Sequence, residues 1–381
     1  MKKNKNKILL IANSSWYIYN FRLPLLRAIK VKGYNLTVIA PRDEYSNLIE
    51  DNGFKFVNWK LNRSSTNPIS EILSIISLFK IVRNEKPTII HNFTIKACMY
   101  GTLVSRFFND ICIINAITGL GHLFVSDSFR TKILRNLLKP FYKIVFKSKR
   151  SFIIFQNFDD KKYLTRIGIT DSKRSALIQG SGVDINHFES LEKVKREFHS
   201  PIRLLFPSRI IKEKGFIEVL SAFNSLIKKG ENLELVLAGA IDEGNKSSLK
   251  KKEFLKLKNN QKIKILGHVK NMKDIYQRSD IVVLPSWREG LSRALIEAAA
   301  MEKPIITTNV PGCKEIIEHG YSGLIVAPKD IASLESAILL LIRNQDLAFK
   351  LAKNTRAKVI REFEVNHINF ETLKQYENLL N

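Results

Sequence analysis

The chain has 381 residues, of which 45% are hydrophobic, enough for two to three packed domains of roughly 150 residues each. This composition excludes an intrinsically disordered or fibrous protein. The formal net charge is +26, and residues 1–200 alone carry 33 basic and 15 acidic residues. The N-terminal half is therefore expected to meet an anionic partner: a phosphorylated substrate, an anionic membrane or a nucleic acid.

No export or membrane span is expected. The opening MKKNKNK is followed by only five apolar residues, fewer than the roughly 7–15 of a secretion signal. The uncharged run Ile111–Ser126 includes polar residues and falls short of the roughly 18 apolar residues that a span needs. Cys98, Cys112 and Cys313 are far apart, which predicts free thiols in a reducing compartment rather than a zinc site.

Short apolar runs rich in β-branched residues alternate with helical-period segments, the pattern of a parallel sheet covered by helices. The runs of the first half are Ile8–Ala12, Leu36–Ala40, Thr88–His91, Ile111–Ala116 and Phe152–Gln156. Those of the second half are Ile202–Pro207, Leu233–Gly239, Lys262–Leu266, Asp280–Leu284, Pro304–Thr308 and Gly323–Val326. The sequence therefore predicts two similar α/β domains.

The domain boundary is predicted in a polar stretch of mixed charge that lacks apolar periodicity. This gives an N-terminal domain of residues 1–184, a linker of residues 185–200 and a C-terminal domain of residues 201–360. Beyond Asp330 the chain is predicted to be nearly continuous helix, and residues 361–381 are expected to return to the first domain.

Several common chemistries lack their signatures. No GxGxxG follows the first predicted strand, and the chain has no Gly-Lys dipeptide for a P-loop. GxSxG, HExxH and a metal-holding DxD pair are absent as well. A ligand would then be held by basic side chains, backbone amides and carboxylates.

The segment 284–300 (LPSWREGLSRALIEAAA) is the richest in candidate residues. A buried strand leads through a Pro/Ser turn into a helix, so Glu289 is expected at the carboxyl edge of the sheet, where open α/β folds bind ligands. Glu297 follows eight residues later, offset by only about 80° around a helix, so both carboxylates can face one cleft. The backbone amides of Gly290, Leu291 and Ser292 are expected to point at an anion.

The segment 205–216 (LFPSRIIKEKGF) repeats the order of strand, loop and helix. Arg209 and Lys214 leave the same edge of the sheet and could bind a diphosphate, Arg209 with its planar fork and Lys214 as a point charge. The two cations would replace the divalent metal that often holds a diphosphate, so no metal or other cofactor is expected.

Glu289 and Glu297 match the E-x7-E motif, and the chain resembles the retaining glycosyltransferases of family 4. The resemblance extends through Arg209 with Lys214-Gly215, Pro304 with Pro311-Gly312 and Glu315, and Gly320 with Gly323. It implies the GT-B architecture of two facing Rossmann-like domains. The N-terminal half, through Trp16–Pro24, Arg63-Ser64, Asn67-Pro68, Thr118–Gly121 and Gln156-Asn157, resembles the branch that builds capsule, O-antigen and lipid-linked glycans.

The resemblance also implies roles. Arg209 and Lys214 would hold the diphosphate of a UDP-sugar donor, Glu297 would bind the ribose hydroxyls, and Glu289 would orient the donor sugar, with Gly312 and Glu315 nearby. The acceptor would be an undecaprenyl-diphosphate-linked saccharide that receives a sugar, an N-acetylhexosamine, by front-face displacement with retention. Each of these residues also has a plain structural reading as a helix-end charge, a surface charge or a turn.

In the N-terminal half, the acceptor-side candidates are Asn20, Arg22, Lys96, Gly119 and Gly121, the two glycines alternatively forming a plain turn. His91 is expected to end the strand Thr88–His91 of the first domain at the ligand-binding edge, as a catalytic candidate beside Glu289, Arg209 and Lys214. Relatives in this branch often carry a second histidine two residues on, whereas this chain has Phe93.

Residues 128–158 contain eight basic residues and no acid, with leucines recurring at helical spacing. The basic stretch 128–150 is expected to dock on an anionic membrane, which gives a cytoplasmic protein peripheral to the inner face of the plasma membrane. The alternatives are a solvated charged face or a nucleic-acid-binding basic α/β protein, although no RNA-binding signature is found. Another GT-B enzyme, such as a sugar-nucleotide epimerase, is the closer alternative to a transferase.

Overall fold

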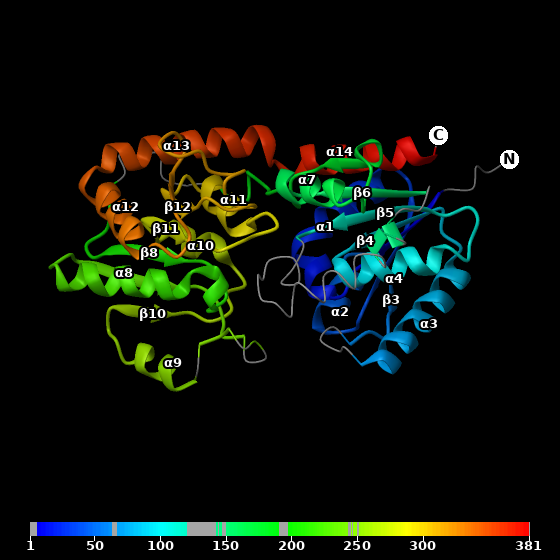
Figure 1. Ribbon diagram of the computed structural model, residues 1–381, viewed down its shortest axis with the longest axis horizontal. Helices are drawn as coiled ribbons and strands as arrows, with labels where there is room; N and C mark the ends of the chain where they lie inside the picture. The colour runs from blue at the N-terminus through cyan, green and yellow to red at the C-terminus, as the bar shows by residue number, and fades with distance from the viewer. Residues whose placement is uncertain are drawn as a thin grey trace. The chain divides into compact units, whose positions relative to one another are not determined.

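The computed structural model describes residues 6–62, 67–119, 142–143, 145–146, 150–189, 197–242, 245, 247–249 and 251–380 (Figure 1). The chain forms two compact units. The first comprises Met1–Ser181 and Asn366–Asn381, and the second comprises Gly182–Val365. Across the part of the chain that the structure describes, every helix is too short or too polar to cross a bilayer.

The first unit is built on a parallel sheet that, within the described residues, has the strand order β3-β2-β1-β4-β5-β6-β7. Its strands are β1 (Lys7–Ile11), β2 (Asn35–Ala40), β3 (Lys55–Asn58), β4 (Ile89–Phe93), β5 (Cys112–Ile117), β6 (Ser151–Phe155) and β7 (Ser175–Leu177). Its helices are α1 (Ser15–Val31), α2 (Glu44–Asp51), α3 (Pro68–Glu85), α4 (Ile95–Ser105), α7 (Phe158–Arg166) and α14 (Val365–Leu380), with a 3₁₀ turn at Ser172–Arg174.

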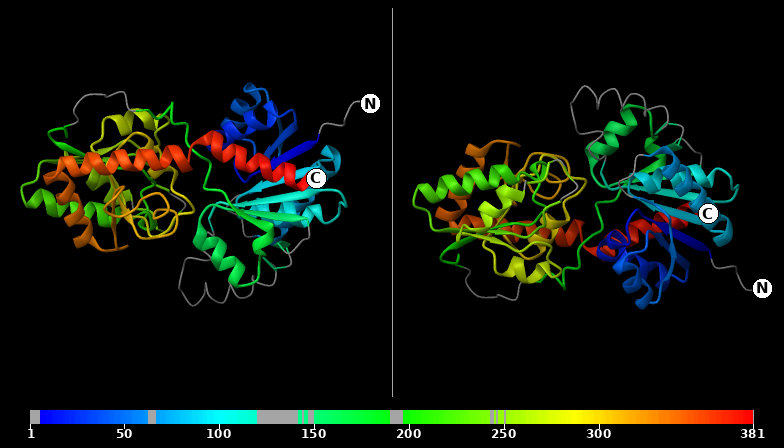
Figure 2. Two further views of the ribbon diagram at one scale, coloured as in Figure 1. Left: turned by 90° about the horizontal axis from the view of Figure 1, so that it is seen from above. Right: turned by 90° about the horizontal axis from the view of Figure 1, so that it is seen from below.

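Helices cover both faces of this sheet, as Figure 2 shows. Ile8, Leu10 and Ile89 point to one face and pack against α1 and α14, whereas Leu9 and Ile90 point to the other and pack against α3 and α4. Successive strand residues point to opposite faces of the sheet. Because helices cover both faces, nearly all of the strand residues are apolar.

The second unit has, in its described part, the strand order β10-β9-β8-β11-β12-β13, again parallel. Its strands are β8 (Ile202–Phe206), β9 (Leu233–Leu237), β10 (Ile263–Ile265), β11 (Ile281–Leu284), β12 (Ile305–Thr308) and β13 (Leu324–Val326). Its helices are α8 (Phe216–Lys228), α9 (Lys251–Lys258), α10 (Met272–Gln277), α11 (Arg293–Ala300), α12 (Ile331–Arg343) and α13 (Gln345–Glu362), with a 3₁₀ turn at Lys212–Lys214.

The predicted pair of parallel-sheet domains and the return of the C-terminal helix are confirmed. Ile368, Leu373 and Tyr376 of α14 are buried in the core of the first unit. The units divide at residues 181/182 and 365/366, and Phe188 and Phe198, from the stretch expected to be a linker, pack in the core of the second unit. The apolar runs identified in the sequence do not include β3 or β7, whose four and three residues are too short to stand out.

Candidate functional site

The two neighbouring strands at the centre of the second unit, β8 and β11, set the position of the candidate site. The chain runs outward from β8 to β9 and β10, and later from β11 to β12 and β13, so the strand order reverses between β8 and β11. The loops that follow these two strands leave the carboxyl edge in opposite directions, and open α/β sheets bind ligands at that point. The loop after β8 carries Arg209 and Lys214, and the loop after β11 carries Glu289.

Direct contacts hold the two loops together. The backbone amide of Trp287 donates to the carbonyl oxygen of Glu213, at 2.9 Å. Gly215 has φ +76°, and a Cβ built there would overlap the carbonyl oxygen of Pro285. Glycine is thus required at the start of α8 both for its left-handed backbone and for the close approach of the β11 loop.

Lys214 and Glu289 form the ion pair at the centre of the site. Lys214 Nζ lies 2.5 Å from Glu289 Oε1 and 2.6 Å from Oε2, and the side chains are only 19% and 11% exposed. The hydroxyl of Ser286, which is fully buried, donates to Glu289 Oε1 at 2.8 Å. The sequence placed both charged residues at this edge but missed that they bind each other and that Ser286 orients the carboxylate.

The loop after β12 supports Glu289 from the other side. Glu289 N donates to Pro311 O at 3.0 Å, and Gly312 N donates to Glu315 Oε2 at 2.7 Å. Gly312 has φ +82°, and a Cβ there would lie 2.6 Å from the Cβ of Glu289. Gly312 and Glu315 therefore position the loop against which Glu289 packs.

The expected set of three anion-binding amides needs one correction. Ser292, the N-cap of α11, donates its amide to the carbonyl oxygen of Gly312 at 2.9 Å, so this N–H is already used within the protein. The prediction treated the amide as an orphan of the helix start, whereas the tertiary contact with the β12 loop satisfies it. Gly290 and Leu291 lie on the partly exposed loop beside Glu289.

Glu297 lies on α11 and is held by two neighbours. Arg293 Nε donates to Glu297 Oε1 at 2.8 Å, and the hydroxyl of Tyr276 donates to Oε2 at 3.3 Å. Burial and the adjacent Glu297 carboxylate raise the pKa of Tyr276 well above its ordinary value, so the phenol remains a donor. The i,i+4 spacing of Arg293 and Glu297 could have revealed their pairing in the sequence, whereas Tyr276 lies 21 residues from Glu297, on the preceding helix α10.

Arg209 is more open than Lys214. Its guanidinium pairs with Asp242 at 2.5 Å, and its side chain is 54% exposed. The structure thus brings Lys214, Glu289, Gly312 and Glu315 into one connected group, and it places Arg209 and Glu297 each with a partner that the sequence had not assigned.

In the first unit, the expected position of His91 is wrong. β4 continues to Phe93, so His91 lies inside the strand, 1% exposed, rather than at its end. Its Nδ1 lies 2.6 Å from the hydroxyl of Tyr376 on α14, and its Nε2 has no hydrogen-bond partner among the described residues. Burial, with the Arg22 cation nearby, holds the pKa of His91 well below its ordinary value, so the imidazole is neutral.

Arg22 is a buried cation next to His91. Only 5% of it is exposed, its Nε and Nη2 donate to the hydroxyl of Tyr17 at 3.0 and 2.9 Å, and its Nη1 donates to Gly180 O at 3.2 Å. The guanidinium carbon lies 4.4 Å from the centre of the Phe93 ring. Among the residues that the structure describes, no carboxylate pairs with it, although a buried charge is costly without a counterion.

Of the other acceptor-side candidates that the structure describes, Asn20 and Lys96 bind residues other than those that hold Arg22. Asn20 is exposed and its amide donates to Trp16 O at 2.9 Å within α1. Lys96, in the first turn of α4, pairs with Glu71 at 2.8 Å. Gly119 follows β5 with φ +139°. Gly121 and most of the basic stretch 128–150 lie outside the described residues.

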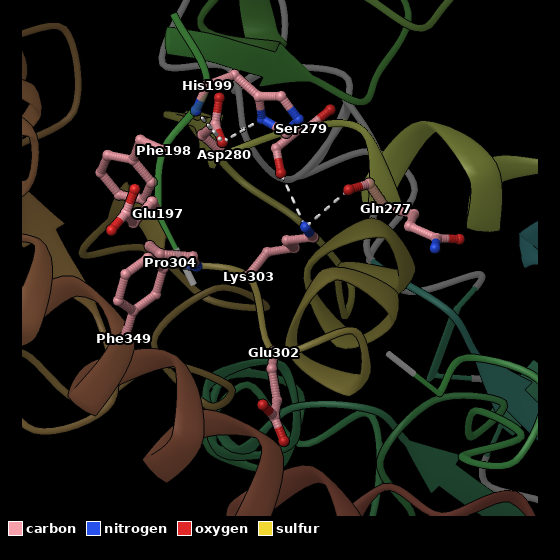
Figure 3. A pocket seen from close by; sticks show the side chains of 10 residues that line it. All are labelled: Glu197, Phe198, His199, Gln277, Ser279, Asp280, Glu302, Lys303, Pro304 and Phe349. Carbon is pink, nitrogen blue, oxygen red and sulfur yellow. Dashed lines mark hydrogen bonds and ion pairs between the residues drawn. The ribbon is translucent and has the colours of Figure 1, made fainter. Parts of the chain in front are cut away.

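The pocket drawn in Figure 3 is at the opposite edge of the second unit from Glu289. Apart from Phe349 on α13, its residues come from segments that precede β8, β11 and β12. Its polar groups bind one another: His199 Nδ1 lies 2.7 Å from Asp280 Oδ1, and Lys303 donates to Ser279 O at 2.8 Å. Such pairing indicates a structural role. Over the described parts of the chain, no group of three or more His, Cys, Asp or Glu side chains could hold a metal ion.

Comparisons with known proteins agree with this arrangement. The family "Glycosyl transferases group 1" matches residues 187–358, and "Glycosyl transferase 4-like" matches residues 7–157. The chain is 28% identical to N,N'-diacetylbacillosaminyl-diphospho-undecaprenol alpha-1,3-N-acetylgalactosaminyltransferase of Campylobacter jejuni, over 95% of this chain and 96% of that protein. It is 26% identical to the capsular polysaccharide biosynthesis glycosyltransferase CapM of Staphylococcus aureus, over 82% of each chain.

A third relative is the UDP-Gal:alpha-D-GlcNAc-diphosphoundecaprenol alpha-1,3-galactosyltransferase of Escherichia coli, 22% identical over 78% of this chain and 77% of its own. Among solved structures, a glycosyltransferase of Rickettsia africae aligns with a TM-score of 0.78 at 21% identity, over 99% of both chains. Anabaena HepE in complex with UDP and glucose aligns with a TM-score of 0.77 at 18% identity, over 98% and 99%. These neighbours confirm the GT-B fold.

The buried neutral His91 predicts a pH dependence of stability. On unfolding, its imidazole regains a pKa of about 6.5 and takes up a proton that the folded state does not bind. The free energy of unfolding should therefore fall as the pH drops below about 6.5, by up to about 1.4 kcal/mol per pH unit from this group. Urea titrations between pH 5 and 8 should show a shallower slope for His91→Gln than for the native chain.

Tyr376→Phe is the matched control for this measurement. It removes the partner of Nδ1 but keeps a buried imidazole, so the steep slope should persist in that variant. Equal slopes in the native chain and His91→Gln would show that His91 binds its proton as readily in the folded protein as in the unfolded chain.

Proposed function

Because this chain belongs to the group 1 and 4-like glycosyltransferases, we propose that it moves an N-acetylhexosamine from a UDP-sugar to an undecaprenyl-diphosphate-linked saccharide, with retention. The observation that carries the proposal is the Lys214–Glu289 ion pair at the strand-order reversal of the second unit. The names of the Campylobacter and Escherichia relatives, both transferases that act on diphospho-undecaprenol-linked sugars, support the choice of acceptor.

Each charged residue of the proposed donor site would bind one part of the UDP-sugar. Arg209 and Lys214 bind the diphosphate, with help from the amides of Gly290 and Leu291. Glu289, fixed by Lys214 and Ser286, orients the sugar through its hydroxyls, and Glu297 accepts hydrogen bonds from the ribose. Lys214 is held in place before the donor arrives, which lowers the entropic cost of binding.

The chemical step breaks the bond between the anomeric carbon and the diphosphate oxygen, and UDP departs with the electron pair. A hydroxyl oxygen of the acceptor forms the new bond from the same face of the sugar, and its proton passes to the leaving phosphate oxygen. Arg209 and Lys214 stabilise the negative charge that grows on the diphosphate. Because this step uses no nucleophile of the protein, charge stabilisation is the main contribution of the protein to the rate.

On the acceptor side, Arg22 is the proposed anion-binding residue. Its neighbours Tyr17 and Phe93 hold the guanidinium in a fixed orientation, and both of its described hydrogen-bond acceptors are neutral. A charge kept buried in this way gains most from a phosphate of the acceptor. Asn20, Lys96 and Gly119 of the same unit are proposed to contact the saccharide of the acceptor. The enzyme would act in the cytoplasm, peripheral to the inner face of the plasma membrane.

The donor proposal predicts distinct effects for the two motif glutamates. Glu297→Ala should weaken UDP binding by about 1–3 kcal/mol, the scale of a lost charge-assisted hydrogen bond. Glu289→Gln should keep UDP affinity but reduce turnover, because it retains the bond to Ser286 and loses the contact between charges. UDP and GDP titrations by calorimetry, with turnover of UDP-sugars, measure both effects.

Glu335→Ala is the control for these variants, because Glu335 is a comparably buried glutamate of the second unit that pairs with Lys229 beside α8. It should change neither UDP affinity nor turnover. Unchanged UDP affinity in Glu297→Ala would remove this residue from the donor site, and full turnover in Glu289→Gln would end its proposed role.

The proposed diphosphate site needs no metal ion. Turnover should therefore be the same with excess EDTA as with added Mg²⁺ or Mn²⁺, since Arg209 and Lys214 supply the positive charge. The variant Arg209→Ala tests the same point from the other direction and should lose UDP binding at any metal concentration. Activity that disappears with EDTA and returns with Mg²⁺ would contradict this part of the proposal.

The acceptor proposal predicts that Arg22→Lys separates the two substrates. The variant keeps the positive charge but loses the planar fork, so KM for the lipid-linked acceptor should rise by roughly ten- to a hundred-fold. UDP affinity should be unaffected, because Arg22 belongs to the other unit. A drop in UDP affinity, or an unchanged KM for the acceptor, would argue that Arg22 only holds Gly180 and α1 in place.

A further inference from the structure

The outward side of α3 carries an apolar stripe that the core does not use. Ile69, Ile72, Leu73 and Ile76 are 70%, 57%, 60% and 45% exposed. Their spacing of three and four residues places them on one face of the helix. Four large aliphatic side chains in a continuous row are unusual on a water-exposed helix and indicate a surface that meets an apolar partner.

The opposite side of the same helix makes the packing contacts. Ser74, Leu78 and Val82 are buried, and Leu78 and Val82 share a core cluster with Trp59 and Val104. α3 thus packs between the sheet and solvent next to α4, as Figure 1 shows. The exposed residues are not needed to hold α3 on the unit, so the stripe requires another explanation.

The stripe becomes basic toward the end of the helix. Lys80 and Arg83 are exposed and follow Ile76 at the same helical spacing. The two acids of α3 face inward instead: Glu71 pairs with Lys96, and Glu85 pairs with Lys7 and Lys55. The outer face of α3, defined as Ile69, Ile72, Leu73, Ile76, Lys80 and Arg83, is therefore apolar at one end, basic at the other and without a negative charge.

The apolar end of this face lies at the ligand-binding edge of the sheet. α3 starts after the carboxyl end of β3, and Glu71 in its first turn pairs with Lys96 in the first turn of α4, which follows β4. An acceptor carried on a lipid would be presented at this same edge.

We propose that the outer face of α3 docks on an anionic lipid bilayer, with the four aliphatic side chains in the interfacial layer and Lys80 and Arg83 on the headgroups. Aliphatic residues beside basic ones match the two components of such a surface. A net charge of +26 opposes self-association and favours an anionic partner. The inference extends the proposed function, but docking itself requires no donor or acceptor.

The test is co-sedimentation of the full chain with vesicles of phosphatidylglycerol and phosphatidylcholine, and with vesicles of phosphatidylcholine alone. The native chain should bind the anionic vesicles, less so at high salt. The double variant Ile72→Ser with Leu73→Ser should bind roughly ten-fold more weakly or worse. Lys80→Gln with Arg83→Gln should lose the preference for phosphatidylglycerol.

Phe370→Ser is the matched control, since Phe370 is 59% exposed on α14 in the same unit. It should leave vesicle binding unchanged, and thermal melting should show that all the variants remain folded. The proposal is overturned if the double serine variant binds vesicles as the native chain does, or if Phe370→Ser weakens binding equally. It is also overturned if light scattering shows a native dimer that the double variant disperses.

A water-soluble short-chain acceptor separates this inference from the proposed function. The double serine variant should turn over that acceptor at the native rate, because it alters docking alone. A native chain that binds vesicles but turns over no acceptor would refute the proposed function and leave the docking face intact.

Discussion

The parallel pairing of β8 with β11 is the constraint on which the candidate site depends. It brings Lys214 and Glu289, 75 residues apart in sequence, within hydrogen-bond distance at one sheet edge. The turn at Gly215 then packs on the Pro285 carbonyl, and the β12 loop at Gly312 closes on Glu289 from the other side. Each of these contacts exists because neighbouring parallel strands deliver their loops to a common edge.

Charge is arranged differently in the two units. In the second, the carboxylates of the site are matched by cations: Glu289 by Lys214 and Glu297 by Arg293. In the first, Arg22 is buried among neutral partners, and the nearby His91 is kept uncharged. A donor arriving with its own negative charge must compete with carboxylates that are already paired, whereas an anion that reaches Arg22 would meet an unneutralised cation.

In the first unit, one face of the sheet carries the buried His91, which contacts the C-terminal helix, and the other face carries α3 with the proposed docking face. Tyr376 of α14 bonds His91 in the centre of the sheet, so the last helix is part of the environment of Arg22. On the other side of the same sheet, α3 turns its acids inward and its aliphatic and basic side chains outward. One sheet thus separates a buried polar cluster from an exposed amphipathic face.

The sequence by itself determined the two parallel-sheet units, the returning helix and the loops that bear Arg209, Lys214 and Glu289, because apolar runs and loop motifs are local patterns. It misplaced His91, since strand ends are set by pairing with neighbours, and β4 extends through pairing with β5 to Phe93.

Only the tertiary structure decided that Ser292 donates its amide to Gly312, that Lys214 binds Glu289, and which side of α3 is buried. α3 is apolar around most of its circumference, so periodicity could not tell the core side from the exposed one. The packing of the chain decides which distant residues become partners, and a local sequence pattern carries no information about that packing.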